Sequence, residues 1–304
     1  MIYFLLILGL LLLFIGGNWL VSGSVAVAHR LKVSPLLIGL TLVGFGTSTP
    51  ELVTSLIATY KGANGISVGN VVGSNISNIL LVLGLAALLN PVYVKGKSFK
   101  RDASFLLLST LILVGASMFG TIGRLLGVIM IGTLIFYVIY SYKTEKEKPS
   151  KKEKLVPLPT SLIRTIIGIL LTLLGAKLLV DNSVELARSW GISESVIGLT
   201  IVAVGTSLPE LATSIFSSIK KQNDVALGNV MGSNIYNALF ILGMTAIFMP
   251  VQIPEQMGFD LVIMTITTFL MVGIALKFKK YTRITGACFL ILYALYIAHL
   301  GGII

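Results

Sequence analysis

"GFGTSTPELVTS", residues Gly44–Ser55, lies within a long apolar run and yet places a proline beside a glutamate. "AVGTSLPELATS", residues Ala203–Ser214, repeats the arrangement 159 residues later. A carboxylate in the middle of a membrane segment costs at least a few kcal/mol. Because this cost is duplicated at matched positions, we interpret Glu51 and Glu210 as members of one functional site.

The motif belongs to a repeat that relates the two halves of the chain. Thr41–Ser55 and Thr200–Ser214 are identical at 10 of 15 positions. Val68–Gly84 and Leu227–Gly243 are identical at 11 of 17 positions, at the same offset. The sequence thus has two related halves, whose central motifs are 44–55 and 69–84 in the first half and 203–214 and 228–243 in the second.

The composition is that of a membrane protein. Hydrophobic residues make up 55% of the 304 residues, charged residues only 12%, and the mean hydropathy is +0.96. The apolar runs are continuous rather than alternating, which favours lipid-embedded helices over barrel strands. Basic residues collect in cytoplasmic loops of such proteins, so the net charge of +11 does not indicate nucleic acid. The expected partner is the lipid bilayer.

Apolar runs long enough to cross a bilayer, which takes roughly 20 residues, occur ten times. The expected spans are 2–28, 34–60, 66–89, 103–120, 123–142, 161–187, 194–219, 225–249, 258–277 and 284–301. A charged, proline-punctuated stretch separates the fifth span from the sixth and is typical of a solvated linker. The predicted organisation is a first five-helix repeat over 1–142, a basic linker over 143–160 and a second five-helix repeat over 161–304.

An odd number of spans in each half turns the second half upside down in the membrane. Such inverted repeats are typical of secondary transporters, with the site at the repeat interface. With the linker in the cytoplasm and both termini extracellular, the inner loops hold 19 Lys and Arg residues and the outer loops hold 3. This imbalance predicts that orientation in the cell membrane. The expected fold class is an all-α polytopic membrane protein of ten transmembrane helices, built as two inverted five-helix repeats with broken helices 2 and 7.

The break in each of these helices is predicted at the proline. Proline is favoured in the first turn of a helix, and Ser48 and Thr49 before Pro50 are suitable N-cap residues. A half-helix starting near Pro50 leaves backbone carbonyls that need partners, and a bound cation is one such partner. The alternative is that each glutamate has only a structural role, such as capping its half-helix. Lys177 cannot pair with both acids, and we expect it to snorkel or to pair with Asp181.

The second motif supplies polar residues on one helical face. Ser74 and Asn78 are four residues apart, as are Ser233 and Asn237. We expect Asn78 and Asn237 to belong to the site. Small and amide residues also join membrane helices to one another. That role and a site role are left open for the other four amides, Asn70, Asn75, Asn229 and Asn234.

The chemistry of these groups is that of hard oxygen ligands. Carboxylates, amides, hydroxyls and carbonyls suit Ca²⁺, which takes 6–8 oxygens. No thiol or imidazole joins them, which argues against zinc and copper. The same oxygens suit several Na⁺ ions, or two protons on the carboxylates. A site with two unneutralised carboxylates is unfavourable in low dielectric, so a carrier of this kind should change conformation mainly when loaded.

The paired stretches "GTSTPE…GNVVGSNISN" and "GTSLPE…GNVMGSNIYN" resemble the two α-repeats of the cation/calcium exchanger superfamily, and the whole chain is most similar to its prokaryotic sodium/calcium exchangers. The resemblance implies a calcium site made by Glu51, Glu210 and the carbonyls of Thr47 and Thr206. It implies a central position at Asn78 and Asn237. It also implies alternating access, in which spans 1 and 6 slide against the other eight. The implied flanking sodium sites use Ser48, Ser74, Ser207, Ser233, the Thr47 and Thr206 side chains, and carbonyls near Gly44 and Ala203.

These observations predict an antiporter rather than an enzyme. The favoured function is Na⁺/Ca²⁺ exchange by a monomer that uses no cofactor besides its transported ions. In some sodium/calcium exchangers an aspartate stands where this chain has Asn237, whereas the proton/calcium exchangers tend to have amides, so H⁺/Ca²⁺ antiport is the alternative. A cation channel is a more distant alternative, because channels tend to build pores from oligomeric rings. A membrane hydrolase is disfavoured, since no HExxH-like or nucleophile–base arrangement is visible.

Overall fold

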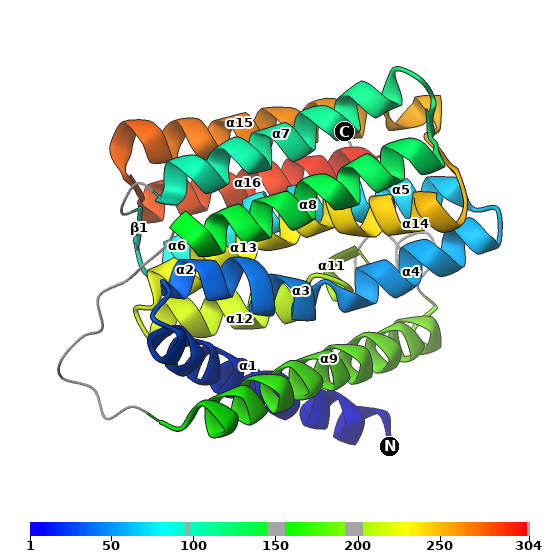
Figure 1. The fold of residues 1–304 in the computed structure, drawn as a ribbon. Helices are drawn as coiled ribbons and strands as arrows, with labels where there is room; N and C mark the ends of the chain where they lie inside the picture. Colours follow the sequence, from blue (N-terminus) through cyan, green and yellow to red (C-terminus); the bar gives the residue numbers. More distant parts are fainter. Residues whose placement is uncertain (95–97, 145–155, 192–202, 303–304) are drawn as a thin grey trace.

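The computed structural model describes residues 1–94, 98–144, 156–191 and 203–302, and within them the chain is almost entirely helical (Figure 1). The helices of the first half are α1 (Ile2–Leu31), α2 (Pro35–Ile38), η1 (Gly39–Val43), α3 (Gly44–Thr47), α4 (Thr49–Tyr60), α5 (Asn64–Ser77), η2 (Asn78–Leu83), α6 (Gly84–Leu89), α7 (Ser98–Ser117) and α8 (Arg124–Thr144). Those of the second half are α9 (Leu158–Ser189), α11 (Ala203–Gly205), α12 (Leu208–Ile219), α13 (Asn223–Tyr236), η4 (Asn237–Ile241), α14 (Leu242–Phe248), η5 (Glu255–Met257), α15 (Gly258–Phe278) and α16 (Arg283–Leu300).

The elements follow the expected order of spans. Among the described residues, seven helices are long and apolar enough to cross a membrane, and the bent pair Pro35–Thr47 and Thr49–Tyr60 forms an eighth candidate span. Two predicted spans remain, the fourth and the seventh. Helix α7 lies at the position of the fourth, and α11 and α12 form the described part of the seventh. The first part of the seventh span and most of the basic linker, residues 192–202 and 145–155, lie outside the described residues.

The two spans that carry the second motif form the centre of the bundle. In the most apolar stretches of Asn64–Leu89 and Asn223–Phe248, 78% and 83% of the residues are buried. The corresponding share for α16 is 22%, and large apolar side chains on α1, α8, α9 and α16 are exposed, as lipid-facing helices require. The polar residues of the second motif are therefore inside protein, away from lipid.

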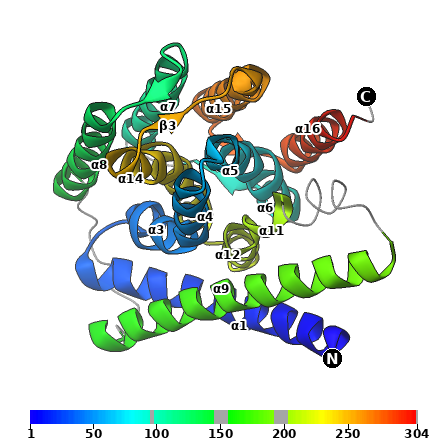
Figure 2. The same ribbon diagram turned by 90° about the vertical axis from the view of Figure 1, so that its right-hand side faces the viewer.

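Helices α1 and α9 form a separate layer that crosses beneath the other helices (Figures 1 and 2). Their backbones approach closely because glycines line the crossing. A Cβ atom built on Gly16 would lie 2.6 Å from the backbone nitrogen of Thr172, and one built on Gly175 would lie 2.7 Å from that of Leu13. Small residues at such crossings are the usual means of close packing between membrane helices. The two helices of this layer are thus closely packed at their crossing.

Two short antiparallel ribbons join the two halves of the chain. Strand β1 (Val92–Tyr93) pairs with β4 (Lys280–Tyr281), and β2 (Thr121–Ile122) pairs with β3 (Val251–Gln252). The β1–β4 ribbon lies at the end where α8 ends and α9 begins, here called the linker end. The β2–β3 ribbon lies at the opposite end, with the N-terminus and the turn between α4 and α5, here called the terminal end (Figures 1 and 2).

Helix α7 begins before the fourth predicted span. We expected the fourth span to begin at residue 103, after the charged residues, whereas α7 begins at Ser98. The reason is that Arg101 and Asp102 satisfy each other: the guanidinium Nε lies 2.7 Å from the Oδ1 atom of Asp102. Arg101 also donates to the side chain of Thr144 at 2.9 Å. Paired in this way, both charged residues are accommodated in the helix.

Candidate functional site

The half-helices of the first motif begin beside Pro50 and Pro209, as the sequence predicted. Helix α4 begins at Thr49 after the N-cap residue Ser48, and the chain bends by 44° at this break. Helix α12 begins at Leu208 after Ser207 in the same way. The Ser48 hydroxyl does not cap its own helix. It donates instead to the Oε1 atom of Glu210 in the other repeat, at 3.3 Å. The residue expected to start the helix therefore joins the two halves of the site.

Glu51 and Glu210 are both buried, each with 1% of its surface exposed. Glu210 accepts a second hydroxyl bond, from Ser233 at 3.4 Å, through the same Oε1 atom. The Oε2 atoms of both carboxylates are buried, and no hydrogen-bond donor among the described residues reaches them. Buried carboxylate oxygens are normally paired or hydrogen-bonded. These two oxygens are therefore available to a cation.

The two carboxylates have different surroundings. Ser48 and Ser233 donate to Glu210, whereas the equivalent hydroxyl of Ser207 has no partner among the described residues. Ser74, equivalent to Ser233, is buried beside a cavity instead. The described geometry thus brings Ser48 and Ser233 together with Glu210 and leaves Ser207 unpartnered.

Two asparagines of the second motif, Asn70 and Asn229, hold the half-helices in place. The sequence left open whether these residues join helices or belong to the site. The side-chain amide of Asn70 donates to the Glu51 carbonyl at 3.0 Å and to the Ser55 hydroxyl at 3.0 Å. Asn229 makes the equivalent bonds to the Glu210 carbonyl at 3.2 Å and to Ser214 at 3.1 Å. Each asparagine therefore ties the backbone of the site glutamate to the neighbouring central helix.

Removing this tie should weaken the site without removing a direct ligand. We expect Asn229→Leu to raise the calcium concentration for half-maximal flux about tenfold, because a buried carbonyl that loses its donor costs about 1–3 kcal/mol. Asn70→Leu should have a similar effect through Glu51. The measurement is calcium-concentration dependence of flux in proteoliposomes. Asn229→Asp, which keeps an acceptor but loses the donor, should resemble Asn229→Leu; a variant of either kind with wild-type affinity would contradict the bracing role.

The remaining amides divide into two groups. Asn75 and Asn234 donate to each other's backbone carbonyls, at 3.4 and 3.2 Å, so they join the two central helices at the repeat interface. Asn78 donates to the Oδ1 atom of Asn234 at 3.0 Å, and its own Oδ1 atom has no partner among the described residues. Neither polar atom of Asn237 has a described partner, although the residue is completely buried. Amide oxygens of Asn78 and Asn237 are thus also available as ligands.

A wide helical turn begins at each of these two residues. The π-helical segments η2 and η4 start at Asn78 and Asn237, respectively. Such turns occur mostly as single insertions in α-helices and frequently mark functional positions. The sequence pattern predicted continuous helices here and gave no sign of these π-helical turns. The only sequence signal was the matched Asn in both repeats.

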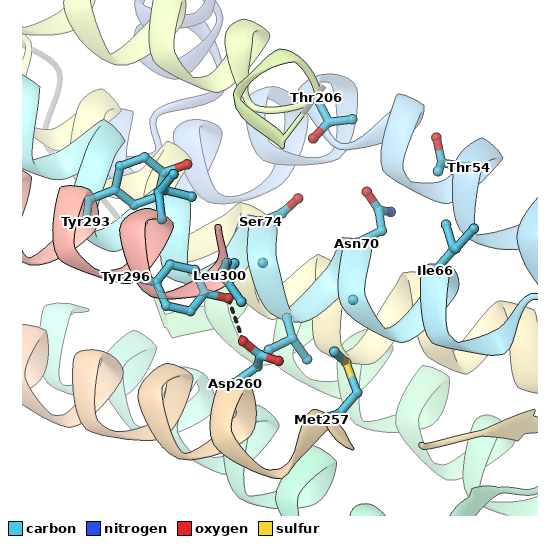
Figure 3. A pocket seen from close by; sticks show the side chains of 14 residues that line it. Thr54, Ile66, Asn70, Ser74, Thr206, Met257, Asp260, Tyr293, Tyr296 and Leu300 are labelled. Atoms are coloured by element: carbon cyan, nitrogen blue, oxygen red, sulfur yellow. Dashed lines mark hydrogen bonds between the residues drawn. The ribbon is translucent and has the colours of Figure 1, made fainter. Parts of the chain in front are cut away.

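The other predicted ligands lie around this centre. The Thr47 hydroxyl lies 3.4 Å from the Oδ1 atom of Asn229, and it also donates to the carbonyls of Val43 and Gly44, at 3.1 and 3.3 Å. The Gly44 carbonyl, expected to be freed by the break, accepts a further bond from the Ser48 amide at 3.1 Å. Thr206 lines a cavity with Ser74, and Ala203 begins the short helix α11 just before it (Figure 3).

The donor set is made of oxygens. Among the residues that the structure describes, no three His, Cys, Asp or Glu side chains come together as a metal cluster. Two carboxylates surrounded by hydroxyl and amide oxygens suit hard cations. Such cations are coordinated by a few charged oxygens and several neutral ones. A buried centre of this kind, at the interface of two inverted repeats with a broken helix, defines a membrane carrier for cations.

The family follows from comparison with known proteins. The sequence profile of the family described as sodium/calcium exchanger protein matches residues 1–143 and 160–301. The chain belongs to this family. It is a multi-pass membrane cation/calcium antiporter and not an enzyme.

Relatives cover nearly the whole chain. An uncharacterized membrane protein of Methanocaldococcus jannaschii, MJ0091, is 38% identical over 302 residues, 98% of this chain and 97% of its own length. The sodium/calcium exchanger MaX1 of Methanosarcina acetivorans is 32% identical over 90% of this chain and 89% of its own. A solved structure of the sodium–calcium exchanger NCX_Mj soaked with Na⁺ and Ca²⁺ matches with a TM-score of 0.86 and 35% identity, covering 98% of this chain and 97% of that one. The all-α fold of ten spans in two inverted repeats is confirmed by this match.

Proposed function

We propose that this protein exchanges Na⁺ for Ca²⁺ across the cell membrane by alternating access, with sodium entry driving calcium extrusion. The observation that carries the proposal is the pair of buried carboxylates, Glu51 and Glu210, whose Oε2 atoms receive no hydrogen bond from the described residues. Two negative charges match one divalent ion. The similarity to proteins named sodium/calcium exchangers, over nearly their full length, supports sodium as the counter-ion.

Each predicted ligand has a place in this proposal. Calcium binds between the carboxylates of Glu51 and Glu210 and the carbonyls of Thr47 and Thr206. The amide oxygens of Asn78 and Asn237 complete the centre. Sodium ions use the hydroxyls around this centre and the neighbouring backbone, namely Ser48, Ser74, Ser207, Ser233, Thr47, Thr206, Gly44 and Ala203.

Coupling follows from the electrostatics of the site. Two carboxylates without a cation repel each other in a low-dielectric interior. The protein therefore switches between its outward-open and inward-open states mainly when cations are bound. In the proposed cycle the α1–α9 pair slides against the other helices and opens the site to each side in turn. The linker end faces the cytoplasm and the terminal end faces outward, in accord with the distribution of Lys and Arg.

Proton/calcium exchange is the competing function, favoured by asparagine at both 78 and 237. To separate the two, purified protein is reconstituted into liposomes loaded with calcium indicator. We expect an imposed sodium gradient to drive calcium uptake against its own gradient, and a pH gradient without sodium to drive none. Hydroxyls are needed to coordinate sodium, whereas protons need only the carboxylates. Calcium uptake driven by the pH gradient alone would overturn the assignment of sodium, and flux without any counter-ion would indicate a channel.

A further inference from the structure

A second acidic residue is duplicated in the two repeats, outside the proposed ion centre. Asp102 of α7 accepts a hydrogen bond from the Tyr137 hydroxyl of α8 at 3.3 Å. Asp260 of α15 accepts one from the Tyr296 hydroxyl of α16 at 2.8 Å. The two tyrosines are 159 residues apart, which is the offset of the repeat, and the two aspartates are 158 apart, so the two Asp–Tyr pairs join corresponding helices of the inverted halves with a shift of one residue at the aspartate. One pair lies toward the linker end and the other toward the terminal end.

The two pairs differ in charge. Asp102 is fully buried and lies against Arg101, whose Nε and Nη2 atoms donate to its two carboxylate oxygens at 2.7 and 3.0 Å. The residue before Asp260 is Phe259, whose side chain is exposed. A neutralising arginine is therefore built into the first repeat and has no counterpart at the same position in the second.

Asp260 and Tyr296 line a cavity of about 480 Å³ whose described lining also includes two of the predicted ligands, Ser74 and Thr206. The cavity passes α5, where Asn70 and Ser74 line it, and extends to Thr206 before α12 (Figure 3). Asp260 is the only charged side chain among its described lining residues. Gly73 of α5, which also lines the cavity, has no atom of another described element within 4 Å of where its Cβ would be, so no described residue fills the space on that side of α5.

We propose that Asp260 recruits cations to this cavity from the outer face of the membrane, its carboxylate coordinating a hydrated Ca²⁺ or Na⁺ before the ion passes to Ser74 and the two site glutamates. This inference rests on the proposed exchange function and on the outward orientation of the terminal end. Tyr296 holds one carboxylate oxygen by its hydrogen bond. A negative charge within low-dielectric walls raises the local concentration of cations.

A purely structural role is the competing explanation, because Asp260 lies in the first turn of α15, where a carboxylate stabilises the helix dipole. The two roles predict different measurements. A structural residue affects thermal stability and the yield of folded protein. A recruiting residue affects the calcium concentration for half-maximal flux, on one side of the membrane and more strongly at low ionic strength.

The experiment compares Asp260→Asn with wild type in right-side-out and everted membrane vesicles. We expect the half-saturating calcium concentration to rise about threefold to tenfold when calcium is supplied at the face reached by the terminal end, and to stay unchanged at the other face. The rise should shrink at high ionic strength. Asp260→Glu should keep near-normal values, and Tyr296→Phe should give a smaller rise of the same sidedness.

Glu255 provides a matched control, since it is exposed and lies five residues earlier, outside the cavity. Glu255→Gln removes the same charge and should leave both half-saturating concentrations unchanged. Unchanged values for Asp260→Asn at both faces, or an equal rise at both, would overturn the recruiting role. Wild-type vesicles that fail to exchange calcium would instead overturn the proposed function.

A binding measurement tests the same inference without transport. Tb³⁺ is a luminescent substitute for Ca²⁺ that is excited through nearby tyrosines. In the double variant Glu51→Gln, Glu210→Gln, we expect tyrosine-sensitised Tb³⁺ luminescence to remain, and the addition of Asp260→Asn or Tyr296→Phe to reduce it at least twofold. Luminescence that is unaffected by both additions would contradict cation binding at Asp260.

Discussion

Replacing Glu51 or Glu210 with glutamine is expected to lower calcium flux by about two orders of magnitude or more. Removing one partner from a buried charge pair typically costs 2–5 kcal/mol, and each 1.4 kcal/mol corresponds to a factor of ten. Glutamine has nearly the same shape, so the half-helix and its tie to Asn70 or Asn229 should persist. It replaces a carboxylate oxygen with either a weaker amide acceptor or an NH₂ group that faces the cation.

The measurement is gradient-driven calcium uptake into proteoliposomes, with thermal unfolding in detergent recorded beside it. Asp181→Asn is the control, because Asp181 is an exposed membrane-helix carboxylate that pairs with Lys177 at 2.7 Å. Exposed pairs contribute little, so this variant should transport normally. Near-normal flux in either glutamate variant would return that acid to a structural role. If one of the two glutamine variants does not fold, its loss of flux says nothing about the ligand role. The role is then tested by Tb³⁺ or calcium binding to the glutamine variant that remains folded.

The sequence was sufficient to predict the features that depend on local pattern. The start of α4 beside Pro50 follows from helix-capping preferences, and the burial of Glu51 follows from its position in an apolar span. Lys177 was expected to snorkel or to pair with Asp181; the structure shows the pair, and their four-residue spacing places both on one face of the helix. Inversion of the second half follows from counting spans, because an odd number per repeat fixes the relative orientation.

Features that depend on contacts between distant segments could not be predicted in this way. The bonds from Asn70 to the Glu51 carbonyl, and from Ser48 to Glu210, join residues brought together only by packing. A single sequence gives the residue types but no partner for them. The same limit applies to the β1–β4 and β2–β3 ribbons, whose two-residue strands are too short for an alternating pattern to be visible. The helical start of α7 before its predicted span was not visible either, because Arg101 and Asp102 were assigned to a loop, although they neutralise each other in the helix.

The α1–α9 layer carries the second large prediction, which concerns Gly168. A Cβ atom built there would meet the backbone nitrogen of Leu20 and would lie 2.7 Å from its Cα atom. Because these contacts are to backbone, no side-chain rotation relieves them. Overpacking of this kind costs about 1–3 kcal/mol even for small additions, and more for a large side chain. Gly168→Leu is therefore expected to push the two helices apart and to reduce calcium flux at least tenfold.

The consequence for transport follows from how the layer is proposed to move. If α1 and α9 slide together against the other helices, their mutual contact must survive both end states, and separating them disrupts movement in either direction. Gly168→Ala should give an intermediate loss of flux with a lower melting temperature. Gly132→Leu is the matched control, since Gly132 is exposed on α8 and a Cβ there meets no atom of the described residues within 4 Å. Wild-type flux and stability in Gly168→Leu would show that the pair tolerates separation, and the sliding of α1 with α9 as one unit would have to be abandoned.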